Sequence, residues 1–440
     1  MKQNFISATI ATSSERRAPA RLAGGKLSTC RAGARRSAVA ALIILAAAAT
    51  ASAANDFKFN FGSDQPAAGW TQVAPTNFYS KEAGHGFEPG AKVVAGKNSS
   101  RSDQPFYFST TLPEGNYQVT ATLGGEAVST TTIKAELRRL MLEKVSTAAD
   151  KAVEKTFIVN LRTPNFNGTN RVRLKDREQT LELWGWDDKL TLEFNGDQPS
   201  LRSLKIEKVA VPTVFLIGDS TVCDQPAESW NSWGQMLPRF FKPEIAVANH
   251  AESGETIKGA LGAKRFDKIF SGLKPGDYLF VQFGHNDMKD KATNALAVYK
   301  ANLEKIVART RALGGTPVLV TSMERKGGVT KDTLGGYPQT VRDVAAEEKV
   351  ALIDLHALSR IFYQSLGADL DKAFQDGTHH NNYGSYELAK CVVNGIRENK
   401  LPLAKSVVDD FSFDPAQPDD ANTFEMAASP NASKAKPLGN

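Results

Sequence analysis

The chain has 440 residues, enough for two domains plus terminal segments, and its 41% hydrophobic and 23% charged residues are an ordinary globular balance. The net charge of +6 comes from the N-terminus, because residues 1–53 hold eight basic and one acidic side chain and leave 46 basic and 47 acidic ones elsewhere. A nucleic-acid-binding protein keeps its basic patch on the folded domain, so composition excludes nucleic acid as a partner.

The N-terminal residues have the order of an export signal. Arg35 and Arg36 precede the apolar run AVAALIILAAAAT, and the small residues Ala51-Ser52-Ala53 follow. This order predicts a signal peptide over residues 1–53, a secreted or periplasmic protein, and no membrane association after cleavage. A retained membrane anchor is the alternative, although the apolar run is short for a bilayer span.

Cysteines give little guidance on compartment. Cys30 lies in the leader, and only Cys223 and Cys391 follow it. Two cysteines are too few for a disulfide scaffold and lack zinc-ligand spacing. Whether they pair with each other in an oxidising compartment stays open.

Residues 55–208 are expected to form a β-sandwich. Short, partly alternating stretches such as GNYQVTATL and KLTLEFNG are separated by Gly, Pro, Asn and Asp, which is typical of a sandwich or jelly roll. The stretch IKAELRRLMLEKV is helical by propensity but lies between strands, so its structure stays open. Trp184 and Trp186 suit either sugar stacking or, more commonly, a core or domain interface.

The pattern changes after Val211-Pro212, and residues 212–405 are expected to form an α/β domain. Apolar runs (TVFLIG, IAVANH, DYLFVQFG, TPVLVTS and VALIDL) alternate with helical stretches. Such strands imply a parallel sheet covered on both faces. An apolar repeat at three- and four-residue steps predicts one amphipathic helix, which the glycine pair Gly314-Gly315 ends. The repeat consists of Leu296, Tyr299, Leu303, Ile306 and Val307. Residues 406–440 are predicted to be a poorly ordered, low-complexity tail.

Polar residues follow these strands where each one ends. Ser220 ends the first strand, Gly254 follows the second, Asn286 follows the third, and Asp376 and His379 follow the last strand and its helix. The carboxyl ends of parallel strands meet at one edge of a sheet, which is where ligands bind. We therefore expect these five residues to converge.

Together they have the groups that acyl transfer needs. A serine hydroxyl needs a base such as imidazole, and the base needs a carboxylate to fix its tautomer. Asp376 lies three residues before His379, so one turn can bring the two together. The backbone N–H groups of Ser220 and Gly254 and the side-chain amide of Asn286 are candidate oxyanion donors. His380 is a rival base, but its side chain is expected to point away from that of His379.

Two other kinds of site fit the sequence less well. A metal cluster would draw on six residues, but their spacing lacks a helix-borne His-Glu pair or a Cys-x-x-Cys: His250, His285, His379, His380, Asp287 and Asp376. The G-x-S-x-G elbow of α/β-hydrolases lacks its second glycine here, which favours a simpler flavodoxin-like sheet. A catalytically silent carbohydrate-binding protein is the alternative from another class.

The stretches GDSTV, ESGET, FGHND and DGTHHNNYG resemble the four sequence blocks of the SGNH (GDSL-type) hydrolases. Ser220-Thr221 after Gly-Asp, with GHND, is similar to the rhamnogalacturonan acetylesterases of carbohydrate esterase family 12. The resemblance implies an SGNH-hydrolase three-layer sandwich with a parallel sheet, preceded by a galactose-binding-like jelly roll.

The resemblance also implies roles and partners. Ser220 would be the nucleophile, His379 the base that Asp376 orients, and Gly254 and Asn286 would complete the oxyanion hole, with no cofactor or metal. The implied substrate is an acetylated polysaccharide, most of all rhamnogalacturonan, with acetyl-xylan or another ester as the alternative. Arg325 and Lys326 are expected either to meet galacturonate carboxylates or to lie in a solvated loop. The oligomeric state stays open.

Overall fold

The computed structural model describes residues 56–434, 436 and 437, so the predicted signal peptide lies outside the described residues. Within that described part, no helix is both long and apolar enough to cross a membrane. The described residues form one compact unit.

The C-terminal half of this unit is built on a parallel sheet of five strands. In chain order the strands are β15 (Thr213–Gly218), β16 (Ala246–Asn249), β17 (Tyr278–Gln282), β18 (Thr316–Val320) and β19 (Ala351–Ile353). Their order across the sheet is β16-β15-β17-β18-β19, and every neighbouring pair is parallel. The predicted flavodoxin-like sheet is therefore confirmed.

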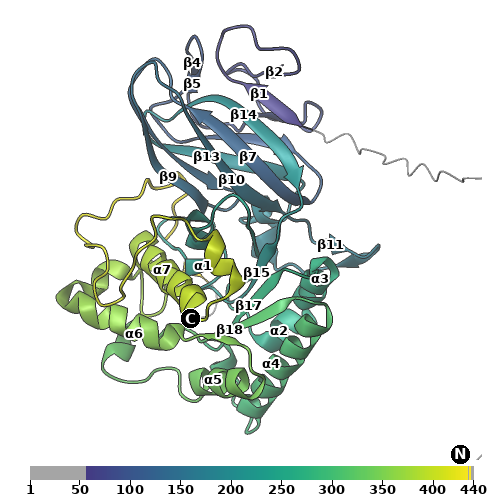
Figure 1. Ribbon diagram of the computed structural model, residues 1–440, viewed down its shortest axis with the longest axis vertical. Coiled ribbons are helices and arrows are strands. Elements are labelled where there is room, and N and C mark those ends of the chain that lie inside the picture. The colour runs from purple at the N-terminus through teal and green to yellow at the C-terminus, as the bar shows by residue number, and fades with distance from the viewer. Residues whose placement is uncertain (1–55, 435, 438–440) are drawn as a thin grey trace, which may run out of the picture. The chain divides into compact units, whose positions relative to one another are not determined.

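Helices cover both faces of this sheet because successive side chains of a strand point to opposite sides. Val214 and Leu216 pack with one group of helices, and Phe215 and Ile217 pack with the other. Figure 1 shows the two groups on opposite sides of the strands. The first group is α1 (Trp233–Met236), α6 (Leu355–Leu366) and α7 (Asn382–Glu398), and the second is α2 (Ile257–Gly262), α3 (Arg265–Gly272), α4 (Ala295–Ala312) and α5 (Tyr337–Glu347).

The predicted amphipathic helix is α4. Tyr299, Leu303 and Ile306 are buried as the repeat requires, whereas Leu296 in the first turn is 38% exposed. Gly314 has a φ of 81°, a conformation that ends the helix at little cost only for glycine. The three-layer α/β arrangement expected for residues 212–405 is confirmed.

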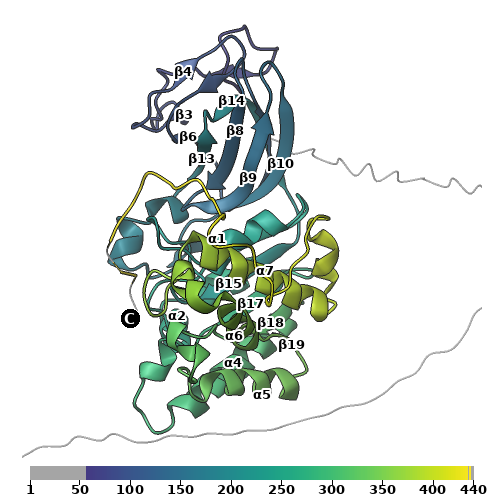
Figure 2. The same ribbon diagram turned by 90° about the vertical axis from the view of Figure 1, so that its left-hand side faces the viewer.

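The N-terminal half contains two mainly antiparallel sheets. The seven-stranded sheet comprises β1 (Phe57–Asn60), β2 (Thr71–Gln72), β4 (Val94–Ala95), β5 (Ser100–Arg101), β7 (Gly115–Leu123), β10 (Val153–Leu161) and β14 (Ser200–Val209). The five-stranded sheet, whose strands are seen in Figure 2, comprises β3 (His85–Phe87), β6 (Phe106–Thr111), β8 (Ser129–Ala135), β9 (Arg139–Thr147) and β13 (Lys189–Asp197).

One hydrophobic core joins the two sheets. Val119 and Leu204 come to it from the seven-stranded sheet, and Phe108, Ile133 and Phe194 come from the five-stranded sheet. A small hairpin, β11 (Asn165–Phe166) with β12 (Asn170–Arg171), and two short 3-10 helices, η1 (Asp176–Gln179) and η2 (Leu183–Gly185), follow β10. That this half has the galactose-binding-like fold in particular stays a prediction.

The stretch IKAELRRLMLEKV forms the turn and flanks of the β8–β9 hairpin rather than a helix. Glu136 and Arg138 both have positive φ, 56° and 63°, so the chain reverses there. Arg138 is buried and donates from Nη1 to the carbonyls of Gln225 and Trp230, 3.0 Å away in each case. Pairing with β8 and contacts with the C-terminal half thus override the local helix propensity.

The expectation of a poorly ordered tail is wrong for residues 407–433. Between the last short helix, η7 (Pro402–Ser406), and Lys434 the chain has no helix or strand, yet it packs against the rest of the protein. Phe411 is buried, and the Ser429 backbone N–H donates to Glu228 Oε1 at 3.0 Å. These contacts are long-range and have no period, so composition alone did not reveal them.

Candidate active site

The first strand of the parallel sheet delivers Ser220 into a fixed turn. A Cβ on Gly218 would lie 2.5 Å from the carbonyl oxygen of Gln282, so only glycine fits where β15 ends. The buried carboxylate of Asp219 then accepts hydrogen bonds from the backbone N–H and the hydroxyl of Thr221, at 3.0 and 2.7 Å. The turn is therefore held from both sides of the serine, whose side chain is largely buried.

Ser220, His379 and Asp376 lie in a continuous chain of contacts. Ser220 Oγ is 2.8 Å from His379 Nε2, and His379 Nδ1 is 3.0 Å from Asp376 Oδ2. Because a carboxylate only accepts, Nδ1 carries the hydrogen and Nε2 is left to accept the serine proton. The imidazole is thereby held in the tautomer of a general base.

Asp376 is kept ionised by its own turn. Burial raises the pKa of this carboxyl, but hydrogen bonds outweigh burial and leave the pKa below its ordinary value. The His379 side chain donates to one oxygen, and the backbone N–H groups of Thr378 and His379 donate to the other, both at 2.7 Å. A carboxylate with three donors favours its charged form, so it can stabilise an imidazolium.

His380 is turned away from this site, as expected. Its Nε2 lies 2.8 Å from the hydroxyl of Tyr363, and its ring packs 4.2 Å from that of Phe374. Burial, followed by the neighbouring charge of His379, lowers the pKa of His380 to about 3. His380 is therefore a neutral core residue.

The three candidate oxyanion donors come from separate loops. Among residues 56–434, 436 and 437, the N–H groups of Ser220 and Gly254 donate to no protein acceptor. Asn286 donates from Nδ2 to the carbonyl of Glu255 at 3.1 Å, and its Oδ1 accepts from Lys289 at 3.1 Å. The side-chain amide thus directs its N–H groups toward the Gly254 loop, which we define as residues 252–256.

Gln225 joins the serine turn to the Gly254 loop and was not foreseen from the sequence. Its Nε2 donates to the Ser220 carbonyl at 2.7 Å and lies 3.3 Å from Ser253 Oγ. Trp230 was also missed, and its ring meets that of His379 edge-on at 5.7 Å. Both residues follow the GDST block in sequence, but nothing in their spacing signalled these contacts.

A cavity of about 430 Å³ lies beside these residues. Gln225 and Trp230 line it from the catalytic half, Arg177 and Leu181 line it from the β-rich half, and Asn431 lines it from the C-terminal segment. Through Gln225 and Trp230 it adjoins the serine turn and the ring of His379. Both halves of the protein therefore build its walls.

Arg325 and Lys326 are engaged within the protein. The Arg325 guanidinium donates to Thr378 Oγ1 at 3.2 Å and to the His285 carbonyl at 3.2 Å, and Lys326 pairs with Asp371. Arg325 therefore holds the His379 turn against the loop of Asn286. The Arg325 guanidinium is therefore not free to meet a substrate carboxylate, whereas the side chains of Lys326 and its partner Asp371 are 35% and 80% exposed.

The tryptophans and cysteines also have defined positions. Trp186 is buried between Arg162 and Arg265, whose guanidinium carbons lie 4.6 and 5.9 Å from the ring, so it is an interface residue. Trp184 packs on Tyr107 at 5.1 Å. Cys223 and Cys391 are both buried and unpaired.

Two groups of side chains in the described residues are close enough to hold a metal ion, and neither contains the residues weighed from sequence. The first group is Glu178, Glu182 and Glu252. Arginines already supply positive charge there, because Arg265 pairs with Glu178 and Arg177 pairs with Glu182. Burial and then the charges of Glu182 and Glu178 raise the pKa of Glu252, which disfavours a third carboxylate charge here.

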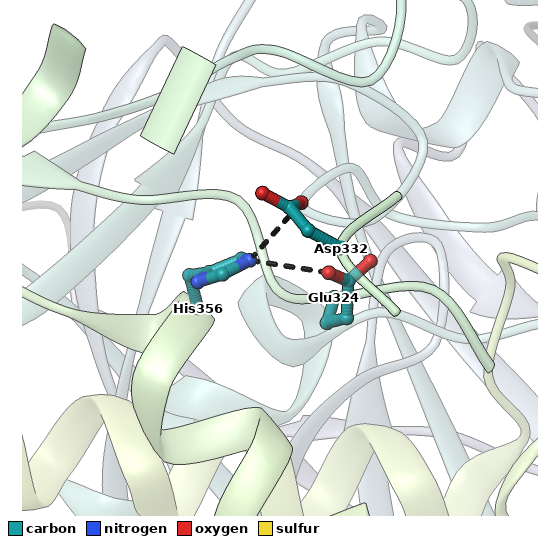
Figure 3. A group of neighbouring side chains, drawn as sticks. All are labelled: Glu324, Asp332 and His356. Carbon is teal, nitrogen blue, oxygen red and sulfur yellow. Dashed lines mark hydrogen bonds and ion pairs between the residues drawn. The ribbon is translucent and has the colours of Figure 1, made fainter. Parts of the chain in front are cut away.

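The second group is Glu324, Asp332 and His356. Figure 3 shows the His356 ring directed at both carboxylates, with Nε2 3.2 Å from Glu324 Oε2 and 3.9 Å from Asp332 Oδ1. On its other side, His356 Nδ1 lies 3.1 Å from Nη2 of Arg342. A guanidinium only donates, so Nδ1 accepts and Nε2 carries the hydrogen. No lone pair is then left on this imidazole for a metal.

Sequence comparison finds relatives of this chain among known proteins. Residues 216–385 match the GDSL-like Lipase/Acylhydrolase family. The chain is 34% identical over 217 residues to the rhamnogalacturonan acetylesterase RhgT of Bacillus subtilis, covering 44% of this chain and 94% of RhgT. It is 26% identical over 370 residues to the uncharacterized esterase YxiM of B. subtilis, covering 78% of this chain and 91% of YxiM.

The crystal structure of YxiM aligns with 79% of this chain and 99% of its own, at a TM-score of 0.44 and 26% identity. The match to RhgT spans nearly all of that protein. The chain therefore belongs to the GDSL-like lipase/acylhydrolase family and is a carboxylic ester hydrolase.

Proposed function

We propose that the protein is a serine esterase that removes acetyl groups from a plant cell-wall polysaccharide, most of all rhamnogalacturonan, through an acetyl-Ser220 intermediate. The observation that carries this proposal is the chain of contacts from Ser220 Oγ to His379 Nε2 at 2.8 Å and from His379 Nδ1 to Asp376 at 3.0 Å. Asp376, His379 and Ser220 are the proposed catalytic residues.

In the first step, Ser220 Oγ attacks the acetyl carbonyl carbon while His379 Nε2 takes the hydroxyl proton. The carbonyl oxygen becomes an oxyanion, which the N–H groups of Ser220 and Gly254 and the Asn286 side-chain amide stabilise. When the tetrahedral intermediate collapses, the bond to the sugar oxygen breaks and His379 gives that oxygen its proton. The deacetylated sugar leaves, and acetyl-Ser220 remains.

In the second step, water replaces the sugar. His379 takes a proton from water, the hydroxide oxygen attacks the acetyl carbon, and the same three donors hold the second oxyanion. Collapse breaks the bond to Ser220 Oγ, which regains its proton from His379, and acetate leaves. Asp376 stabilises the imidazolium in both steps, since its carboxylate is fixed at Nδ1.

The choice of a carbohydrate acetyl ester rests on the relatives. RhgT is named a rhamnogalacturonan acetylesterase, and this chain aligns with 94% of its length. Thr221 after the nucleophile replaces the leucine of plain GDSL lipases, which argues against a lipid substrate. Export is part of the proposal, because polysaccharide is found outside the cell and the leader of residues 1–53 has the order of a signal peptide.

The test is acetate release from acetylated rhamnogalacturonan and, separately, from acetyl-xylan by the wild type and by Ser220→Ala. We expect the wild type to have the higher kcat/KM on rhamnogalacturonan, and Ser220→Ala to release no acetate above background from either. A preference for xylan would overturn the substrate and leave the mechanism standing. Equal release by Ser220→Ala would overturn the mechanism.

Labelling separates an esterase from a silent carbohydrate-binding protein. A fluorophosphonate reacts only with an activated serine, so the folded protein should give one adduct, which peptide mapping places on Ser220. Ser220→Ala and heat-unfolded protein are the controls and should remain unlabelled. Folded protein that binds polysaccharide but takes no label would favour the binding protein.

A further inference from the structure

The Gly254 loop receives a lysine from the other half of the protein. Lys175, which lies just before η1 in the β-rich half, donates from Nζ to the carbonyl oxygen of Ser253 at 2.6 Å. We infer that Lys175 is a positioning residue that fixes and polarises the Ser253–Gly254 peptide, whose N–H is one of the proposed oxyanion donors. This inference rests on the proposed function and assigns a partner to its site.

The effect follows from the peptide group. The carbonyl of Ser253 and the N–H of Gly254 belong to one planar unit, in which they point in opposite directions. Holding the carbonyl from one side therefore sets the direction of the N–H on the other. A hydrogen bond from an ammonium ion to the carbonyl also polarises the unit and strengthens its N–H as a donor.

This loop needs outside support because of its glycine. Gly254 has a φ of 71°, and glycine has the widest choice of backbone conformations. Contacts in addition to Lys175 restrict the loop: Ser253 Oγ lies 3.4 Å from Cys223 Sγ, and the Glu255 carbonyl accepts from Asn286. Among these contacts, the ammonium group of Lys175 is the charged donor, and it binds the Ser253–Gly254 peptide directly.

Lys175 is itself anchored to the catalytic half. Its backbone N–H donates to Glu178 Oε2 at 2.8 Å, and both carboxylate oxygens of Glu178 are bound by the guanidinium of Arg265 at the start of α3. The side chains of Glu178 and Arg265 are fully buried. The Lys175 ammonium also lies 3.6 Å from Glu255 Oε2 within the Gly254 loop.

This arrangement gives the β-rich half a role in the reaction. Arg177 in the same segment lies 3.8 Å from Glu252 Oε1, so the first residue of the Gly254 loop also has a partner there. The segment from Lys175 to Glu182 therefore acts as a brace for the oxyanion hole. The catalytic half without this brace would have a less ordered Gly254 N–H.

The test uses Lys175→Met with Lys208→Met as the matched control. Lys208 belongs to the same half and also donates to a backbone carbonyl, that of Glu114 at 2.8 Å, but the Gly254 loop is not among its partners. We expect Lys175→Met to lower kcat by about 10-fold, less than the ~10²–10³ for outright loss of an oxyanion donor. KM should be unchanged, as should the pH dependence that His379 imparts, since neither substrate binding nor the base is altered.

Two readouts distinguish positioning from general damage. Affinity for a boronic acid, which binds as a tetrahedral adduct of Ser220, should fall in parallel with kcat, while Tm stays at the value of Lys208→Met. Lys175→Arg, which keeps a charged donor, should restore most of kcat. Should Lys175→Met fail to fold, Lys175→Gln takes its place, and we expect kcat between those of the wild type and Ser220→Ala.

A folded Lys175→Met or Lys175→Gln with the kcat and boronate affinity of Lys208→Met would overturn the inference. A loss of kcat with unchanged boronate affinity would also overturn it, because the oxyanion hole would then be intact. Substantial acetate release by Ser220→Ala would instead defeat the proposed function, so the two failures can be told apart.

Discussion

His356 lies at the start of α6, directly after β19, and His379 lies in the loop before α7. Each ring contacts a carboxylate, yet their second ring nitrogens meet opposite partners. His379 Nδ1 is held by Asp376, and Nε2 lies 2.8 Å from the Ser220 hydroxyl, which can donate a proton. His356 Nε2 is held by Glu324, and Nδ1 lies 3.1 Å from the Arg342 guanidinium, which never releases one.

The difference shows that an acid–imidazole pair is not by itself a catalytic device. The partner of the ring nitrogen that does not contact the carboxylate decides whether the imidazole can act as a base or only forms structural hydrogen bonds. At His379 the chain of contacts ends in a nucleophile beside a cavity. At His356 it ends in the ion pair of Arg342 with Asp354, at 2.8 Å.

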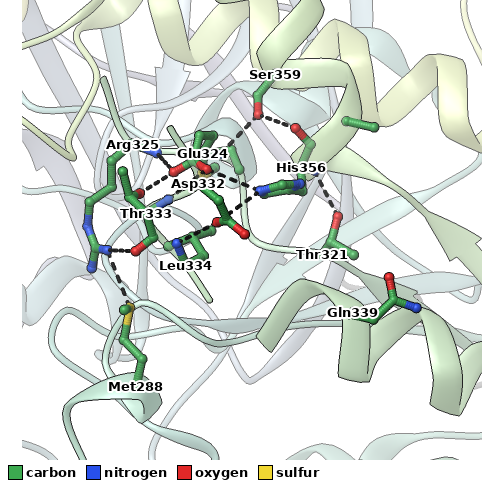
Figure 4. A network of polar contacts seen from close by, with 12 residues as sticks. Met288, Thr321, Glu324, Arg325, Asp332, Thr333, Leu334, Gln339, His356 and Ser359 are labelled. Atoms are coloured by element: carbon green, nitrogen blue, oxygen red, sulfur yellow. Dashed lines mark hydrogen bonds and ion pairs between the residues drawn. The ribbon is translucent and has the colours of Figure 1, made fainter. Parts of the chain in front are cut away.

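The residues around His356 have a structural role that supports the active site around His379. Figure 4 shows Glu324 at the centre of a network that includes Thr333, Arg325 and His356. Its carboxylate accepts from the Arg325 backbone at 2.7 Å and from both the hydroxyl and backbone N–H of Thr333. Arg325 in turn reaches Thr378 beside the base. The network therefore supports the turn that carries His379.

The sharpest way to break this comparison is to replace each histidine by glutamine. His379→Gln removes the base, and we expect kcat on an acetyl ester to fall about 10⁴-fold or more. His356→Gln keeps a polar side chain at a position that takes no part in the proposed reaction, so kcat should change less than about 3-fold. Steady-state kinetics on both purified variants decide it, and a comparable loss in His356→Gln would contradict the assignment.

The second largest effect on kcat is expected from the proposed oxyanion hole, which belongs to the site of His379 and not to that of His356. Asn286→Ala removes one proposed donor and should lower kcat by ~10²–10³ with little change in KM. Asn286→Asp is the matched variant, because it keeps the size and loses the N–H groups. Wild-type kcat in Asn286→Asp would remove Asn286 from the oxyanion hole.

A smaller effect is expected on stability. Burial raises the pKa of Glu324, but hydrogen bonds from His356, Thr333 and Arg325 outweigh it and lower the pKa from 4.5 to about 2. A folded pKa below the unfolded one gives stability that is present above pH 4.5 and lost as pH falls toward 2. Glu324→Gln should cost about 1–3 kcal/mol of unfolding free energy at pH 7 and flatten this dependence.

Urea unfolding of Glu324→Gln and wild type at pH 7 and pH 3.5 provides the measurement. The free-energy gap between the two proteins should narrow at the lower pH, because the wild-type carboxylate contributes less there. A gap that is constant with pH would show that the ionised form of Glu324 is not what stabilises the network.

The smallest expected effect is that of a chelator. Dialysis against EDTA should leave kcat and Tm unchanged, because arginine guanidinium groups contact both groups of candidate ligands. Loss of activity that added zinc restores would show that one of these groups holds a metal after all.

Much of the catalytic half could be predicted because its signals are local. Each buried strand is a run of apolar residues, and the helix α4 has its repeat within 18 residues. Ser220 and His379 are 159 positions apart, yet their approach was expected, because parallel strands place their carboxyl ends on one edge. The sequence pattern thus predicted the layers and the approach of Ser220 and His379 at that edge.

The sequence by itself determined the parallel sheet, the nucleophile turn and the Asp376–His379 pair, since each depends on residues that are close in the chain or on a repeated strand-end position. Only the tertiary structure decided which distant side chains hold these features in place. Lys175 and Ser253 are 78 positions apart, and Arg265 and Glu178 are 87 apart. A charged side chain has the same local pattern whether it is solvated or buried against a distant partner, so its role appears only when the chain has folded.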